Sequence, residues 1–332
     1  MSAPIFDAEL EVACQCTLGE GIMWDDKTEL LHWVDIDEAK VHSYDPVSKA
    51  HSVAVYPETG FVSAIAPRVD GPGLVAGFEF SVALINPPAP TAAASSTPIT
   101  DKATATVAAP LTQEYVASSM VRFNDGACDP AGRFVIGSMT RPEKGDGILR
   151  GELFSIDPKT GASTKLLESV GCSNGIDWSL DGKTMYYVDS NEPRVSTFDY
   201  DVATGAISNR QTLVSPPADI DGRATVGAFD GLVVDGAGNI WVARWADQRI
   251  VGYTPRGEVI AHIRVPGVKS PTIPCFGGKD LSTMYIATAS ANLAGAGDIQ
   301  AQFPQSGDVF KIECGPGSPL GKVLGDQWKG RI

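Results

Sequence analysis

The sequence lacks the features that mark membrane, secreted and nucleic-acid-binding proteins. It contains no uninterrupted apolar run long enough to span a bilayer, no signal-like basic and apolar start, and no Asn-x-Ser/Thr acceptor. Basic residues are outnumbered, since 26 Lys and Arg stand against 40 Asp and Glu, and no basic stripe offsets the net charge of −14. We therefore expect a soluble, cytoplasmic protein with neither a nucleic-acid nor a membrane partner.

Cysteine and histidine are also scarce, and their spacing argues against an imidazole or thiolate zinc site. The six cysteines are irregularly spaced, and the C-x-C motif of Cys14 and Cys16 has no second pair nearby. None of the four histidines is paired at the spacing of metal ligands. We expect the cysteines to be free thiols.

Helical periodicity is missing as well. No segment of 12 or more residues shows a convincing helical period, which argues against an α/β fold. Glycine and proline together number 58 (35 Gly and 23 Pro) and are scattered along the chain. This distribution indicates many tight turns between short strands.

One unit recurs along the chain: a small polar loop, a short apolar strand, an Asp/Gly turn and a second apolar strand. NDGACDPAGRFVIGSM from Asn124 and DGLVVDGAGNIWVARW from Asp230 are clear copies. A further hairpin, such as FSIDPKTGASTKLL, follows, and two hairpins make the four strands of a propeller blade. Six copies can be recognised at a mean spacing of about 50 residues, a normal blade length. They begin at residues 20, 63, 124, 174, 230 and 271.

These repeats predict an all-β fold, a single six-bladed β-propeller over residues 1–332 with four-stranded blades. ELEVAC near the N-terminus and DVFKIEC at 308–314 are both strand-like. We expect them to pair in one blade, because closing the ring across the two termini removes exposed sheet edges. The segment 86–110 is rich in Pro, Ala, Thr and Ser, and we interpret it as a surface-loop insertion in the second blade that contributes no packed strand.

The residues that open the six units are expected to converge at one mouth of the central channel. Several offer carboxylate or amide oxygen, which suits a hard divalent cation such as calcium, magnesium or manganese. Asn-Gly and Asp-Gly are also common turn dipeptides, so each could be structural instead. Their recurrence at the same phase of the repeat favours a shared site. The residues are Glu20, Ser63, Asn124, Asp125, Asn174, Asp230 and Thr272.

Four ordered motifs resemble the senescence-marker protein, gluconolactonase and luciferin-regenerating family. They are LGEGIMW from Leu18, RFNDGACDPAGRFVIGSM from Arg122, SNGIDWSLDGKTMYYVDS from Ser173 and FDGLVVDGAGNIWVARW from Phe229. The resemblance runs from about residue 10 to 315. It implies a six-bladed propeller with one divalent metal ion, and an activity that in many members is the hydrolysis of aldonolactones.

The same resemblance assigns roles to individual residues. It implies that Glu20, Asn174 and Asp230 are the metal ligands, and that Arg122 and Asn124 contact the substrate or a water on the metal. Calcium is the first expectation for the ion, with magnesium, manganese, zinc and ferrous iron as alternatives. Asp125 is interpreted first as a turn-stabilising residue.

The chain departs from the family pattern at one place. Several relatives have a Glu soon after G-T-M that holds sugar hydroxyls. This chain has GSMTRPEKGDG, with Pro142 at that place and Glu143 beside it. Glu143 is therefore a third candidate for substrate binding, and the motif leaves the sugar preference open.

The predicted reaction is the opening of a sugar lactone, which is an ester. The metal ion would polarise the lactone carbonyl and activate water, and Asp230 would move the proton or serve only as a ligand. The alternatives are a calcium- or ligand-binding propeller without turnover, and a hydrolase of another ester or of organophosphates. A serine hydrolase using Ser173, in G-C-S-N-G, would require a following helix and a later histidine such as His262. Trp245 is a candidate for the pocket wall.

Overall fold

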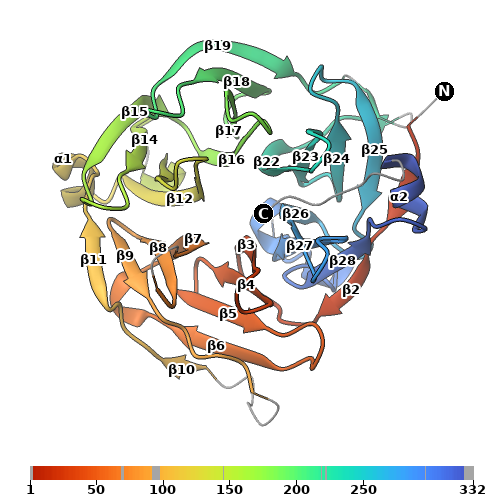
Figure 1. Cartoon of the computed structure of the whole chain (residues 1–332), viewed down its shortest axis with the longest axis horizontal. Helices are drawn as coiled ribbons and strands as arrows, with labels where there is room; N and C mark the ends of the chain where they lie inside the picture. Colours follow the sequence, from red (N-terminus) through yellow and green to blue (C-terminus); the bar gives the residue numbers. More distant parts are fainter. Residues whose placement is uncertain are drawn as a thin grey trace.

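The computed structural model describes residues 3–68, 71–91, 98–144, 146–217, 219–220, 223–295 and 297–324. Six β-sheets stand as blades around a central axis, and each contains four strands from the axis to the rim (Figure 1). The prediction of a six-bladed β-propeller with four-stranded blades is confirmed. In every blade, strands that follow one another in the sequence pair antiparallel.

The two strands nearest the axis come from the hairpins that define the repeat. The innermost strands are β3 (Gly19–Asp25), β7 (Val62–Pro67), β12 (Val121–Cys128), β16 (Ser173–Trp178), β22 (Ala228–Val234) and β26 (Ser270–Gly277). Their partners are β4 (Leu30–Asp35), β8 (Leu74–Phe78), β13 (Phe134–Thr140), β17 (Thr184–Asp189), β23 (Ile240–Trp245) and β27 (Thr283–Ala289).

The two outer strands complete each blade. The third strands are β5 (Lys40–Tyr44), β9 (Val82–Ile85), β14 (Gly151–Ile156), β18 (Val195–Tyr200), β24 (Arg249–Tyr253) and β28 (Val309–Glu313). The fourth are β6 (His51–Val55), β11 (Ala105–Ala108), β15 (Ser163–Val170), β19 (Ile207–Val214), β25 (Val259–Arg264) and β2 (Glu9–Val12). A fifth strand, β1 (Ile5–Asp7) or β10 (Ile99–Thr100), pairs parallel with β25 or β6.

Short elements join the blades. β20 (Asp219–Ile220) and β21 (Arg223–Ala224) form a small hairpin of their own. The α-helices are α1 (Gln113–Ala117) and α2 (Pro319–Leu324), and the 3₁₀ helices are η1 (Pro57–Thr59), η2 (Pro142–Lys144), η3 (Ala291–Ala294) and η4 (Gln300–Gln302). Across the described ranges, every helix is too short or too polar to traverse a bilayer.

The Asp-x-x-Gly turns of the repeat are explained by their hydrogen bonds. In the third blade, Asp129 Oδ1 accepts the backbone N–H groups of Ala131 and Arg133, at 2.9 and 2.8 Å. Gly132 follows with φ of 84°, a left-handed conformation that glycine adopts without steric cost. Each inner hairpin of this kind is therefore specified locally by its own sequence.

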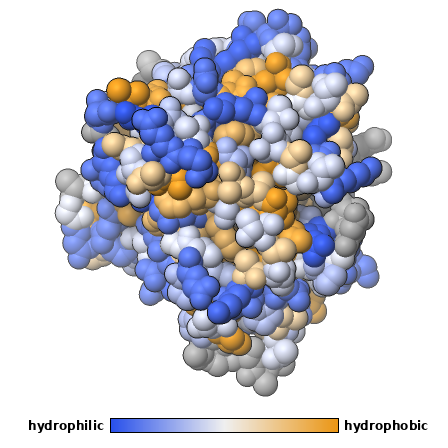
Figure 2. Space-filling model, turned by 90° about the vertical axis from the view of Figure 1, so that its left-hand side faces the viewer, coloured by the Kyte–Doolittle hydropathy of each residue, from blue (hydrophilic) through white to orange (hydrophobic). Residues whose placement is uncertain are grey.

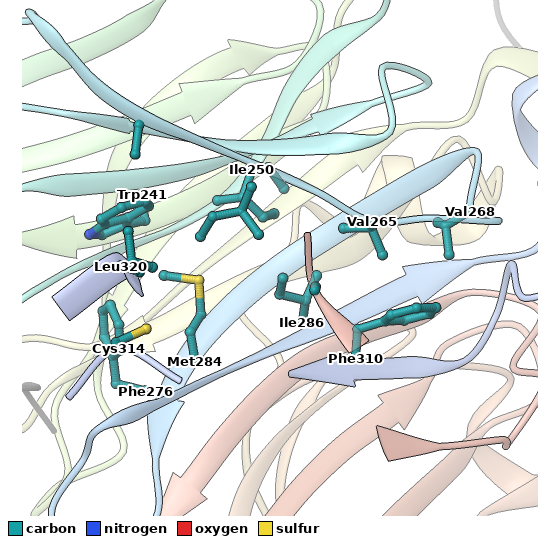
Figure 3. Close-up of a cluster of buried hydrophobic side chains, with 14 residues drawn as sticks. Trp241, Ile250, Val265, Val268, Phe276, Met284, Ile286, Phe310, Cys314 and Leu320 are labelled. Atoms are coloured by element: carbon teal, nitrogen blue, oxygen red, sulfur yellow. The ribbon is translucent and has the colours of Figure 1, made fainter. Parts of the chain in front are cut away.

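Apolar side chains fill the spaces between neighbouring blades. Between the fifth and sixth blades, Trp241 and Ile250 pack near Met284, Ile286 and Phe310, each at most 1% exposed (Figure 3). The rim is different, since hydrophilic and hydrophobic residues are intermixed on the side seen in Figure 2. The stabilising apolar burial therefore lies between the faces of adjacent blades, and each blade depends on its neighbours.

The ring closes as the sequence predicts. β2, from the N-terminal segment, pairs antiparallel with β28, and Leu10 lies opposite Phe310. The sixth blade is thus built from both ends of the chain. Just before β2, β1 lies on β25 of the fifth blade, where Asp7 forms an ion pair with Arg264 at 2.6 Å.

The interpretation of residues 86–110 as a segment without packed strands is wrong for its second half. β11 is the outer strand of the second blade, and Val107 and Ala108 pack against the core between the second and third blades. An outer strand needs one hydrogen-bonded partner and only half-buried side chains, so the small and β-branched residues of ATVA suffice. Residues 92–97 of this segment lie outside the described residues.

Replacing Val12 with Asp should destabilise the sixth blade, in which the two ends of the ring pair. Val12 is 8% exposed in the core between the first and sixth blades, so Val12→Asp should lower the free energy of unfolding by about 3 kcal/mol or more. Leu10 on the same strand is 41% exposed, and Leu10→Asp, the matched control, should change it by about 0.5 kcal/mol or less. Denaturant midpoints measure both values. Equal losses would contradict the role of Val12 in closure.

Candidate functional site

The candidate residues lie where the six inner strands are irregular. In every blade the register between the inner strand and its partner shifts once, at or next to the predicted ring position. Such β-bulges turn a side chain away from its regular direction. Glu20 pairs with Val34 and is the last residue before the shift in the first blade. The positions inside the shifts of the other blades include Ser63, Asn124, Asp125, Asn174, Asp230 and Thr272.

The glycines that follow the candidate residues are required by close packing around the axis. A Cβ atom on Gly175 would lie 2.8 Å from the carbonyl oxygen of Asp230 in the next blade. A Cβ atom on Gly231 would lie 2.8 Å from the carbonyl oxygen of Thr272, again in the next blade. The Asn-Gly and Asp-Gly pairs therefore lie in crowded strands, and their interpretation as turn dipeptides is wrong at these positions.

One cavity of about 330 Å³ brings most of the predicted site together. Its lining includes the three predicted metal ligands, Glu20, Asn174 and Asp230, and both residues of the R-x-N motif, Arg122 and Asn124. Apolar side chains form part of the wall, among them Leu18, Met139, Leu293 and the predicted Trp245.

Four other candidates lie outside this lining, and one of them is the buried Asp125. Glu143 is exposed in η2. Ser63 donates to the carbonyl oxygen of Gly77 at 3.3 Å, and Thr272 donates to that of Gly19 at 2.6 Å. The hydroxyls of Ser63 and Thr272 thus hold strands together.

The amide of Asn174 is oriented by a chain of hydrogen bonds. Ser190 Oγ donates to the carbonyl oxygen of Phe229 at 2.7 Å, so its lone pairs are left to accept from Asn174 Nδ2 at 2.9 Å. Asn174 Oδ1 is therefore turned the other way. It is buried and has no hydrogen-bond partner within the described chain. A buried amide oxygen without a donor is a ready ligand for a cation.

Three buried carboxyl groups stand close to one another in the site. Burial raises the pKa of Glu20, and the charges of Asp230 and Asp125 raise it further, while Arg122 opposes this shift. Burial and the charge of Asp125 also raise the pKa of Asp230. Burial raises the pKa of Asp125 to about 7. Asp125, which lies in a strand rather than a turn, thus contributes negative potential to both carboxylate ligands.

The donor set fits a hard divalent cation. Glu20 and Asp230 supply carboxylate oxygens and Asn174 an amide oxygen, and their mutual repulsion would be relieved by positive charge. In the part of the chain that the structure describes, no three His, Cys, Asp or Glu side chains are placed to hold a metal ion. A site at this place therefore depends on the amide oxygen of Asn174 beside the two carboxylates.

Arg122 is held in place before any ligand arrives. Its Nη1 donates to the carbonyl oxygen of Phe123 and to Asn124 Oδ1, both at 2.8 Å. Asn124 Nδ2 in turn donates to the carbonyl oxygen of Ser173 at 2.9 Å. The ring of Phe61 lies against the guanidinium, with its centroid 5.3 Å from the central carbon of Arg122. Both hydrogen bonds of this guanidinium use Nη1, which leaves Nε and Nη2 for a ligand.

Sequence reasoning missed Ser190 and Cys172. Ser190 directly follows β17, the second strand of the hairpin that carries Asn174, so hairpin register could have suggested it. Cys172 lines the cavity, and burial raises the pKa of its thiol to about 12, which keeps the thiol neutral. Nothing in the sequence signals this position of Cys172.

The serine-hydrolase alternative is not supported. Ser173 is fully buried and its hydroxyl accepts a hydrogen bond from Tyr187 at 3.1 Å. A Cβ atom on Gly137 of the neighbouring blade would lie 1.9 Å from Ser173 Oγ, which shows how tightly this hydroxyl is enclosed. The following element is strand β17 rather than a helix, so the nucleophile geometry is missing.

Comparisons with known proteins identify relatives of this chain. Residues 18–290 match the model of the SMP-30/Gluconolactonase/LRE-like region. The chain is 34% identical to regucalcin of Xenopus laevis over 89% of this chain and 90% of that protein. It is 32% identical to pentonolactonase XacC of Haloferax volcanii, over 91% and 92% of the two chains. The structure of a calcium-binding protein, regucalcin, from Agrobacterium tumefaciens superposes with a TM-score of 0.76 at 26% identity, covering 100% and 98%.

Replacing Asp230 with Asn should relieve the carboxyl cluster. A raised carboxyl pKa means that the folded state holds the proton more tightly than the unfolded chain does. The associated stability is complete below the unfolded pKa, near 4, and is lost as pH rises through the folded value, about 7 for Asp125. In chelator, Asp230→Asn should therefore stabilise the protein at pH 8 relative to pH 5, by about 1 kcal/mol or more.

Denaturant unfolding at both pH values measures this difference. Asp181→Asn serves as the control, because Asp181 is exposed in a hairpin turn and its hydrogen bond to Ser179 lowers its pKa. The control should show no gain at high pH. A flat pH response for Asp230→Asn would mean that the three carboxyls do not repel one another.

Proposed function

We propose, from the premise that this chain belongs to the SMP-30/gluconolactonase/LRE-like family, that it is a divalent-metal-dependent lactonase. Its substrate would be a sugar lactone, opened to the aldonic acid. The observation that carries the proposal is the convergence of two carboxylates and the unpartnered Asn174 Oδ1 in one cavity beside Arg122. The name of one relative, pentonolactonase, supports the lactonase activity. The name of another, a calcium-binding regucalcin, supports the divalent metal ion.

Glu20, Asn174 and Asp230 would hold the ion, and calcium is our first choice. When bound, such an ion polarises the carbonyl of the lactone and lowers the pKa of water. Two carboxylates balance the charge of a divalent cation without making the site negative, so the ion can still attract a carbonyl oxygen. The Ser190 hydroxyl would keep the amide oxygen of Asn174 turned toward the ion.

Asp230 is the group to which we assign proton transfer. Its carboxyl is 3% exposed and lines the cavity, so it is placed beside the space that a substrate and a water would occupy. Asp230 would take a proton from the attacking water. It would return the proton to the ring oxygen as the bond between that oxygen and the carbonyl carbon breaks, so that the product is the open hydroxy acid.

Arg122 would orient the substrate. Its Nε and Nη2 can donate charge-assisted hydrogen bonds to hydroxyl or carbonyl oxygens of the lactone. Asn124 supports this role, because it accepts from Arg122 and donates to Ser173, which fixes the guanidinium. Trp245 offers an apolar wall for the carbon face of the ring. Glu143 stays a prediction, since it is exposed and outside the cavity lining.

Chelation and metal return test the function directly. Protein stripped of divalent ions should lose hydrolysis of glucono-, galactono-, xylono- and arabinono-lactones, measured above the spontaneous rate. Calcium, magnesium, manganese, zinc or ferrous iron, returned singly, should restore it. In the active form, Asp230→Asn should lower kcat by at least about 100-fold.

Calorimetric titration of the natural protein and of Asp230→Asn with the cation separates a catalytic role of the site from a role in binding alone. Turnover by Asp230→Asn with bound cation would leave Asp230 as a ligand only. Tight cation binding by the natural protein, without hydrolysis of any lactone or other ester, would favour a binding role. Activity that ignores the chelator would exclude the metal-dependent mechanism.

The Ser190 hydroxyl should matter for cation affinity. Ser190→Ala frees the Asn174 amide to rotate, so the dissociation constant for calcium should rise about tenfold, as for loss of an outer-shell partner. Ser63→Ala is the matched control, because this hydroxyl lies outside the cavity lining and donates to the carbonyl oxygen of Gly77. The control should bind calcium normally. Equal affinities for both variants would argue against Asn174 as a ligand.

A further inference from the structure

A second group of reactive side chains lies away from the axis, where the first and sixth blades meet. Cys14 Sγ and Cys16 Sγ are 3.7 Å apart. Cys16 Sγ is also 3.7 Å from His42 Nε2, and His42 Nδ1 is 3.0 Å from His51 Nε2. Two thiols and two imidazoles therefore form a continuous series of contacts, which the proposed lactonase chemistry does not use.

The two thiols differ in their access to solvent. Cys14 is half-buried, whereas Cys16 is 2% exposed. Cys16 also lines a separate cavity of about 350 Å³, together with Gln15, Thr17 and Gln300. A small oxidant can therefore approach this segment without entering the central site.

We propose that Cys14 and Cys16 form a reversible dithiol–disulfide couple, and that His42 and His51 carry away the proton of the buried thiol. The proposal concerns a modification site outside the central cavity and does not depend on the lactonase function. The ligand class is a small thiol-directed oxidant, either a peroxide or a low-molecular-weight disulfide.

The backbone around the two cysteines is already fixed. Gln15, between them, has a left-handed φ of 49°, and its N–H donates to Asp308 Oδ1 at 2.9 Å. The N–H of Cys16 donates to the carbonyl oxygen of Gly307 at 2.7 Å. A disulfide requires the sulfurs to approach to about 2.05 Å. With the backbone held, rotation of the two side chains is the movement that would close the remaining gap.

Either oxidant can convert the two thiols to a disulfide in two steps. With glutathione disulfide, the Cys14 thiolate attacks one sulfur and releases one glutathione thiolate. The thiolate of Cys16 then attacks Cys14 in the mixed disulfide and releases the second glutathione. With a peroxide, the Cys14 thiolate attacks one oxygen and becomes a sulfenic acid, and the O–O bond breaks to release the other oxygen as water or an alcohol. The hydroxyl of the sulfenic acid then leaves as water when Cys16 attacks. In both cases two thiols lose two electrons and two protons, and one of these protons comes from the buried Cys16.

The histidines supply a route for that proton. Burial, together with the neighbouring charges of His51 and Lys40, lowers the pKa of His42 to about 3, so its ring is neutral at physiological pH. A neutral His42 that donates from Nδ1 to His51 Nε2 has Nε2 left to accept from the Cys16 thiol. His51 is half-buried and can pass a proton to water. The pair can thus move a proton from a buried sulfur to solvent by exchanging tautomers.

Peptide mapping in glutathione redox buffers tests the couple. Trypsin releases residues 1–27 as one peptide whose only cysteines are Cys14 and Cys16. In oxidised buffer, after unreacted thiols are alkylated, this peptide should lack two hydrogens and carry no alkyl group, and reductant should reverse the change. The control is Cys128, the single cysteine of the tryptic peptide 123–133, which should carry an alkyl group or glutathione and should not lose two hydrogens. Free thiols, or glutathione on Cys14 of the natural protein as the end product, would overturn the proposal.

Variants test the order of events and the relay. Cys16→Ser should trap glutathione on Cys14, whereas Cys14→Ser should leave the buried Cys16 reduced. His42→Phe keeps a ring against Trp33 but removes both nitrogens, and should slow disulfide formation at least about tenfold. His51→Phe should act in the same direction while leaving His42 in place. Unchanged rates in both histidine variants, with normal unfolding temperatures, would overturn the relay.

Discussion

Crowding at the propeller axis is the constraint from which the central site follows. Six inner strands approach so closely that Gly175 and Gly231 have no room for a Cβ atom beside the backbone of the next blade. The strands accommodate this by bulging, and the bulges bring Glu20, Asn174 and Asp230 to one cavity. The same glycines that permit the packing therefore follow two of the proposed ligands, Asn174 and Asp230.

Crowding also determines the electrostatics. Carboxyl groups brought together in a buried space repel one another, which raises the pKa values of Glu20 and Asp230. Arg122 offsets only part of this negative potential, because burial and the charges of Asp230 and Asp125 shift the pKa of Glu20 more than the charge of Arg122 does. A cation would satisfy the carboxylates and the unpartnered Asn174 oxygen together. The repulsion that destabilises the protein without a cation is thus the same interaction that would favour cation binding.

Most of the fold and much of the site could be predicted from the sequence, for a physical reason. A blade repeats every 50 residues or so, and equivalent positions meet at the axis, so phase in the repeat predicts proximity. Contacts between side chains of different blades do not recur with this spacing, so the repeat does not predict them. The hydrogen bond that turns the Asn174 amide comes from Ser190, and the burial of Cys172 depends on neighbours outside its hairpin. The Pro, Ala, Thr and Ser content of residues 86–110 led to a wrong prediction at β11, because an outer strand needs few large apolar side chains.

The three proposed ligands rest on two different supports. Asn174 is joined to the fifth blade through Ser190 and the carbonyl of Phe229, the residue before Asp230, so these two ligands are coupled by hydrogen bonds. Glu20 instead follows the segment that closes the ring, whose N–H groups at Thr17 and Leu18 donate to Asp35 at 2.9 and 3.0 Å. Closure of the ring is therefore part of the site, because it sets the distance between Glu20 and the other two ligands.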